Sequence, residues 1–115
     1  MLKILPLDFS FSDERGTITQ LIHEGYRQIN VITSKAGVFR GGHYHKCNQE
    51  AFYIVSGLVM VTVNEKEYTF HSGDFFGIDA YDMHSFSFLE DTVLVSMYSD
   101  GVEHPDGSKD IYTER

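Results

Sequence analysis

Short runs of β-branched and aromatic residues, separated by turn-forming residues every eight to twelve positions, dominate this sequence. The runs cover residues 17–22, 29–33, 51–55, 58–63 and 92–98, and Gly-, Asn- or Asp-containing turns lie between them. Evenly spaced short strands are typical of an all-β sandwich or barrel. No segment of helical length has apolar residues at helical spacing. We therefore expect an all-β fold.

The length of 115 residues fits one domain. We expect a single domain over residues 1–115, with its barrel core at about 13–98 and a polar C-terminal tail at 99–115 that either wraps the barrel or frays. A net charge of −8 argues against a nucleic-acid partner, because the chain has no cationic excess to displace counterions.

The cysteine content and the length of the apolar runs bear on where the protein works. The single cysteine, Cys47, cannot form an internal disulfide, so nothing requires an oxidising compartment. The apolar runs are too short to span a membrane. These features predict a cytoplasmic protein without a membrane partner.

Six histidines are present, and two of them, His43 and His45, stand two positions apart. Residues two apart on a strand point to one face, so both imidazoles are expected on one side. Glu50 opens the strongest strand candidate, and a hairpin would bring it beside the pair. His84 begins an alternating stretch with Phe86 and Phe88, which predicts an inward position within an apolar shell.

Three imidazoles and one carboxylate suit zinc, iron, manganese, nickel or copper and leave coordination positions open. The alternative is that these are ordinary polar residues at strand ends, with His84 a hydrogen-bonded core histidine. The other three histidines lack partner spacing, and we expect them at the surface: His23, His71 and His104. We also expect Cys47 to be unreactive.

The string Gly37-x5-His43-x-His45-x4-Glu50-x6-Gly57 resembles the first signature motif of the cupin family at every defined position. The second motif is partly present: Gly73 and His84 match, whereas Asp79, Tyr81 and Phe88 replace its proline, glycine and asparagine. The resemblance implies a double-stranded β-helix, or jelly-roll barrel. It also implies that His43, His45, Glu50 and His84 are the ligands of a divalent metal ion.

Residues 13–16 and 38–46 resemble the motifs of sugar-nucleotide 3,5-epimerases and 3,4-ketoisomerases, and of the zinc-binding cupin domain of capsule-synthesis nucleotide-sugar reductases. This resemblance implies proton abstraction next to the carbonyl of a 4-keto-sugar. His43, or water on its metal, would be the base and Tyr81 would relay the proton. Arg40 would contact the diphosphate, with Lys46 as a second substrate-binding cation.

Two other functions remain open at this point: a metal-dependent oxidoreductase of the dioxygenase type, and a non-catalytic cupin that binds a sugar or another small molecule. The acidic charge would repel an anionic substrate unless cations gather at the mouth of the barrel. Cupins of this kind are usually dimers, so we expect a homodimer with the segment around residues 3–11 contributing.

Overall fold

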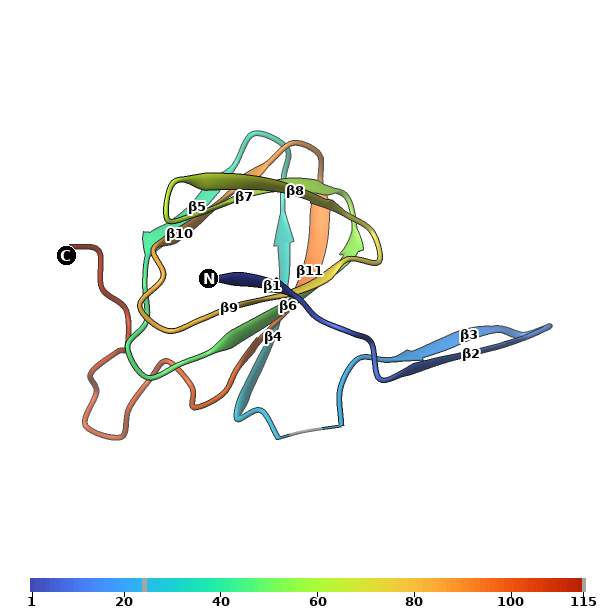
Figure 1. Ribbon diagram of the computed structural model, residues 1–115, viewed down its shortest axis with the longest axis horizontal. Helices are drawn as coiled ribbons and strands as arrows, with labels where there is room; N and C mark the ends of the chain where they lie inside the picture. Colours follow the sequence, from blue (N-terminus) through green and yellow to red (C-terminus); the bar gives the residue numbers. More distant parts are fainter. Residues whose placement is uncertain (24, 115) are drawn as a thin grey trace.

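Antiparallel β-sheets make up the fold in the computed structural model, which describes residues 1–23 and 25–114. The larger sheet has the order β1 (Leu2–Ile4), β9 (Phe75–Ile78), β6 (Glu50–Ser56), β11 (Thr92–Tyr98) and β4 (Gln28–Ser34). The second has the order β5 (Phe39–His43), β10 (His84–Phe88), β7 (Leu58–Val63) and β8 (Lys66–His71). β2 (Phe9–Asp13) and β3 (Gly16–Gln20) form a separate hairpin. The expected all-β fold is confirmed (Figure 1).

The core lies between the two larger sheets. In β10 and β11 burial alternates along most of the strand, as expected for strands with one face in a core. The buried cluster comes from both sheets and consists of Phe52, Ile54, Val59, Val61, Val63, Phe70, Phe76, Ile78, Phe86, Phe88 and Leu94. The inward position predicted for His84 beside Phe86 and Phe88 is therefore confirmed.

The expected runs at 58–63 and 92–98 coincide with β7 and β11, and the other expected strands differ from the observed ones by a few residues. The shared strand expected for His43 and His45 is wrong in one respect. β5 ends at His43, and His45 lies beyond it, after an isolated bridge between Tyr44 and Tyr112. The chain segment that carries His45 is thus positioned by the C-terminal tail and not by a regular sheet.

Gly41 and Gly42 interrupt the regular geometry of β5. Both have positive φ, and the pairing of β5 with β10 shifts between His84 and Ser85. A side chain at Gly41 would place its Cβ 2.9 Å from the His84 carbonyl oxygen. Such bulges redirect the side chains beside them, and here the bulge leaves His43 directly opposite His84.

The β2–β3 hairpin extends away from the barrel (Figure 1). Phe9, Phe11 and Ile18 are exposed on one of its faces, and serine and threonine side chains occupy the other. An isolated two-stranded hairpin is marginally stable in water. The apolar face of this arm is therefore not covered by the barrel of the same chain.

The polar C-terminal tail does not fray freely but lies along one end of the barrel (Figure 1), where it is bonded to the segment after β5. Tyr112 exchanges two backbone hydrogen bonds with Tyr44, of 2.9 and 3.0 Å. Asp110 is 1% exposed although it lies in a polar segment. Among the described residues, no helix is long and apolar enough to cross a membrane.

The turn between β6 and β7 provides a test of the fold. Gly57 has φ +110°, and an added Cβ would lie 2.3 Å from the Thr92 hydroxyl oxygen. We expect Gly57→Ala to lower the free energy of unfolding by about 3 kcal/mol or more, because backbone strain and overlap add. Gly73→Ala is the matched control, since φ is +92° but no atom lies within 4 Å, and it should cost only about 1–2 kcal/mol. Urea unfolding of both variants measures the difference, and equal losses would contradict the packing argument.

Candidate metal centre

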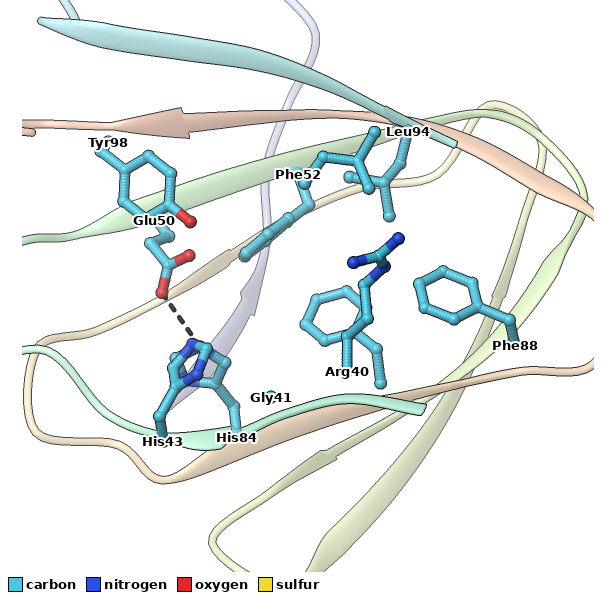
Figure 2. Close-up of a pocket in the computed structure, with 11 residues that line it drawn as sticks. Arg40, Gly41, His43, Glu50, Phe52, His84, Phe88, Leu94 and Tyr98 are labelled. Atoms are coloured by element: carbon cyan, nitrogen blue, oxygen red, sulfur yellow. Dashed lines mark ion pairs between the residues drawn. The ribbon is translucent and has the colours of Figure 1, made fainter. Parts of the chain in front are cut away.

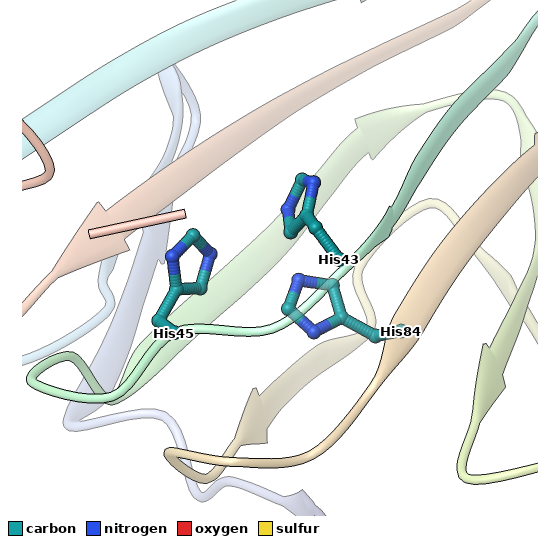
Figure 3. Close-up of side chains that lie close together, drawn as sticks. All are labelled: His43, His45 and His84. Atoms are coloured by element: carbon teal, nitrogen blue, oxygen red, sulfur yellow. The ribbon is translucent and has the colours of Figure 1, made fainter. Parts of the chain in front are cut away.

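Three imidazoles converge at one end of the barrel (Figure 3). His43 comes from the end of β5, His84 from the start of β10, and His45 from the segment after β5. One nitrogen from each ring lies within 4.8 Å of the other two. The structure thus brings together residues that are 41 positions apart in the sequence, from 43 to 84.

Glu50 supplies a carboxylate to the same place from the start of β6. Its Oε1 atom lies 2.9 Å from His45 Nε2 and 3.1 Å from His84 Nε2, and all three side chains are buried. Figure 2 shows Glu50 facing His84 across the end of the cavity. The sequence-predicted set of three histidines and one glutamate is therefore assembled in space.

Backbone carbonyl groups hold the outer nitrogens of two of these rings. His45 Nδ1 faces the Asp110 carbonyl oxygen, and His84 Nδ1 lies 2.9 Å from that of Asp82. A carbonyl oxygen can only accept a hydrogen bond, so each Nδ1 is assigned its proton from this geometry. In a neutral ring the inward Nε2 then carries a lone pair.

The inward lone pairs of both rings point to the same carboxylate oxygen, which is itself an acceptor. Among the described side chains His45 Nε2 is buried without a hydrogen-bond partner of suitable geometry, despite its 2.9 Å distance to Glu50. Such a convergence of acceptors requires positive charge, either protons on the rings or a cation between them. A set of three imidazole nitrogens and one carboxylate oxygen is compatible with a divalent transition metal.

The charges of the cluster shift its protonation. Burial, with His84 and His45 close by, lowers the pKa of His43 to about 4. Burial alone would raise the pKa of Glu50, but its interactions with His45 and His84 lower it to about 2. Burial opposes a charge on His45, yet the Glu50 carboxylate outweighs it and raises the pKa of His45. At neutral pH the Glu50 carboxylate is therefore ionised, and the His43 imidazole is neutral and has a lone pair to give to a metal ion.

A cavity of about 110 Å³ opens beside the cluster. His43, Glu50, His84 and Tyr98 lie at its polar end, and Arg40 and Gly41 also line it (Figure 2). The remaining lining is apolar and consists of Ile32, Phe52, Phe86, Phe88 and Leu94. The cavity therefore has the histidine–glutamate cluster at one end, where charge can be stabilised, and apolar side chains together with Arg40 along the rest of its lining.

Arg40 and Lys46 occupy different surroundings. The Arg40 side chain extends toward Phe88 and Leu94 (Figure 2), and its Nε donates a 2.8 Å hydrogen bond to Ser34 Oγ. Lys46 does not line this cavity, and its ammonium lies 4.1 Å from the centre of the Tyr112 ring. Of the two cations assigned to substrate, Arg40 is the one that lines the cavity, and its side chain lies away from the cluster.

Tyr81 also lies outside the cavity lining. It is 57% exposed, and its ring stacks on Tyr44 at a centroid distance of 6.4 Å. Its backbone N–H donates to the His45 carbonyl oxygen at 2.7 Å, which ties its loop to the segment carrying His45. Tyr81 is thus near the cluster through its backbone, while its side chain faces another surface.

Tyr98 lines the cavity and was missed by reasoning from the sequence. Burial and the Glu50 carboxylate raise the pKa of its phenol, so the group stays protonated. Strand alternation could have found it. Leu94 and Tyr98 are four positions apart, so they point to the same face of the strand, and Leu94 is a core residue. Asp110 was missed as well, and no local pattern in the polar tail points to it.

The remaining histidines and the cysteine lie apart from this cluster. His23 and His71 are exposed, and His104 is half-buried in the C-terminal tail. Cys47 is a free, exposed thiol. None of these side chains lines the cavity.

One curated relative matches part of the chain. The UDP-2-acetamido-2,6-beta-L-arabino-hexul-4-ose reductase of Pseudomonas aeruginosa is 38% identical in an alignment 64 residues long, and the alignment covers 50% of this chain. The matched region is 17% of the length of that protein. The similarity thus concerns one part of a much longer relative.

Solved structures match almost the whole chain in shape. A 3,4-ketoisomerase from Helicobacter canadensis has a TM-score of 0.82 at 20% identity, with 98% of this chain and 90% of that one covered. The TDP-quinovose 3,4-ketoisomerase of Campylobacter jejuni has a TM-score of 0.83 at 18% identity, with coverage of 98% and 92%. At these identities the likeness establishes a shared fold.

The family profile of the cupin domain matches residues 30–98. This range includes all four side chains of the cluster and most of both large sheets. It covers more than half of the sequence, and the chain therefore belongs to the cupin family.

Proposed function

We propose that this chain binds one divalent metal ion through His43, His45, Glu50 and His84 and acts on a nucleotide-linked 4-keto-sugar by proton abstraction. The observation that carries the metal proposal is the convergence of His45 Nε2 and His84 Nε2 on Glu50 Oε1, at 2.9 and 3.1 Å, with His45 Nε2 buried and without a hydrogen-bond partner of suitable geometry. A divalent ion held there would supply Lewis-acid stabilisation of an enolate oxygen.

The cavity residues support the proton-transfer chemistry. His43 is neutral at pH 7 because of its lowered pKa, so its inward nitrogen has a lone pair for the ion. With that lone pair taken, water held at the ion beside His43 would accept the proton next to the ketone. The C–H electron pair then moves into the enolate. Tyr98 stays protonated, which suits it to donate a proton back, the role that the sequence motif had assigned to Tyr81.

The substrate class is supported by Arg40 and by the fold. A guanidinium at the cavity is a bidentate donor suited to a diphosphate. The structural neighbours named above are 3,4-ketoisomerases, one of them named for TDP-quinovose. At about 110 Å³ the cavity admits only the reacting edge of a sugar, so the nucleotide would remain outside the barrel.

The size of the cavity also favours a second candidate, a cupin that binds a small molecule without transforming it. A space of about 110 Å³ with five apolar lining side chains is smaller than most enzyme pockets. A compact ligand with one polar group would fill it. Turnover on a keto-sugar separates the two functions.

Metal binding is tested by titration of the metal-free protein with Zn²⁺ or Co²⁺. We expect one ion per chain, and at free metal 100-fold above Kd the free energy of unfolding should rise by about 2.7 kcal/mol. His45→Asn should weaken binding about 100-fold, since it removes a ligand and leaves Glu50 less compensated. The control is His71→Asn at an exposed histidine. Identical melting curves with metal and with chelator would contradict the proposal.

Catalysis is tested by incubation with a 4-keto-6-deoxy nucleotide sugar in heavy water. We expect deuterium at the carbon next to the ketone, detected by mass spectrometry and NMR. Tyr98→Phe should slow the reaction by about 100-fold or more, because a proton donor is lost. Tyr53→Phe is the matched control, since Tyr53 does not line the cavity. Oxygen uptake without deuterium incorporation would favour an oxidoreductase, and neither activity would favour the small-molecule binder.

We also propose that two copies of the chain pair through the β2–β3 arm. The outer face of the larger sheet is half covered by the chain itself, where Leu5, Leu21, Ile22 and Tyr26 pack over Ala51, Phe75 and Met97. The other half of the face exposes Ile29, Val31 and Val55. The arm of a second copy, with Phe9, Phe11 and Ile18, matches this surface in character, and a two-fold axis would cover both arms at once.

Light scattering during gel filtration tests the pairing. Wild type should elute with twice the mass of one chain, and Val31→Asp should shift it to the monomer, because a charge would be buried in the interface. Leu89→Asp is the control at an exposed apolar residue in the turn after β10. A wild-type monomer at micromolar concentration would remove the proposal.

A further inference from the structure

Asp110 connects the C-terminal tail to the chain segment that carries His45. Its carboxylate accepts three hydrogen bonds from that segment: from the Lys46 backbone N–H at 2.8 Å, the Cys47 backbone N–H at 2.9 Å and Asn48 Nδ2 at 2.8 Å. The two segments are more than 60 positions apart in the sequence. A carboxylate in this position satisfies amide donors that no strand partner satisfies.

The same residue also holds the imidazole of His45. The Asp110 carbonyl oxygen accepts the hydrogen bond from His45 Nδ1, which directs Nε2 toward Glu50. Asp110 itself is held by its backbone N–H, which donates to the Val102 carbonyl oxygen at 2.9 Å. One residue of the tail therefore determines both the path of the segment and the orientation of its ring.

Neighbouring contacts make the attachment rigid. Asn48 accepts backbone hydrogen bonds from Asp100 and Gly101, at 2.8 and 2.9 Å, and is 1% exposed. Tyr44 and Tyr112 exchange two backbone hydrogen bonds on the other side of His45. The segment from 44 to 48 is thus held at both ends by the tail.

We propose that Asp110 is a positioning residue for the metal centre, and that residues 99–114 form a strap that presets His45 as a ligand. This inference rests on the proposed metal site. Outer groups that orient a metal-bound imidazole typically change metal affinity by about 10–100-fold when they are removed. If the strap only anchored the end of the chain, weakening it would lower stability without changing the orientation of the His45 ring.

The test compares Asp110→Asn with wild type and with Asp106→Asn. Asp106 is an exposed residue of the same tail whose carboxylate accepts hydrogen bonds from the backbone N–H and the hydroxyl of Ser108, so its substitution controls for the loss of one charge. In Asp110→Asn one of the two acceptor oxygens becomes an NH2 group, which then faces an N–H donor of the 46–48 segment. We expect Co²⁺ affinity about 10–100-fold below wild type, with an altered ligand-field spectrum, while Asp106→Asn binds as wild type does.

Two measurements on the metal-free protein separate failure of this inference from failure of the metal site. Hydrogen exchange at the Lys46 and Cys47 amides should speed up in Asp110→Asn, while exchange at Val61 and Leu94 in the core stays slow. Nitrogen NMR should show the His45 ring losing its single Nδ1–H tautomer. If the Asn variant does not fold, Asp110→Ser keeps a shorter acceptor and takes its place.

Wild-type metal affinity in the folded Asp110 variant overturns the inference, whatever the effect on stability. If wild type itself binds no metal, the proposed metal site fails. The strap is then judged by amide exchange and by the His45 tautomer, and unchanged values for Asp110→Asn overturn it as well. Weakened binding together with a disturbed tautomer supports it.

Discussion

A buried carboxylate that faces two imidazole nitrogens is the interaction on which the functional end of this barrel depends. Removing Glu50 from water is costly unless positive charge compensates it. The outer nitrogens of His45 and His84 are already bonded to backbone carbonyl groups, so their inner nitrogens are left facing the same oxygen. The fold therefore brings two imidazole nitrogens and a carboxylate oxygen close together. Their lone pairs and negative charge are compensated only by a proton or a cation between them.

The surroundings of this cluster determine what it can do. The cavity beside it is apolar along most of its lining, which strengthens electrostatic interactions at its polar end. Tyr98 and His43 lie at that end with opposite proton-transfer capacities, a protonated phenol and a neutral imidazole. These two groups support the proposed enolate chemistry, whereas the narrow volume limits how much of a substrate can enter.

The two ends of the chain contribute in different ways. The N-terminal arm extends outward with an exposed apolar face, which is the surface used in the proposed pairing of two copies. The C-terminal tail folds back and bonds the segment that carries His45. Both ends lie largely outside the range matched by the family profile, although one of them holds a member of the candidate site in place.

The sequence by itself indicated the all-β class through its short, evenly spaced strands, and it indicated His43, His45, Glu50 and His84 through their spacing in the cupin motif. Strand alternation placed His84 correctly, but His45 lies beyond the strand expected for it. The sequence did not determine which tyrosine faces the cavity. Tyr81 precedes a ligand in the sequence, but its loop turns the ring toward Tyr44, while Tyr98 arrives from a distant strand. Nor did it indicate Asp110, whose partners are more than 60 positions away. Only the tertiary structure decided these two residues, since contacts between distant segments follow from how the sheets and the tail pack.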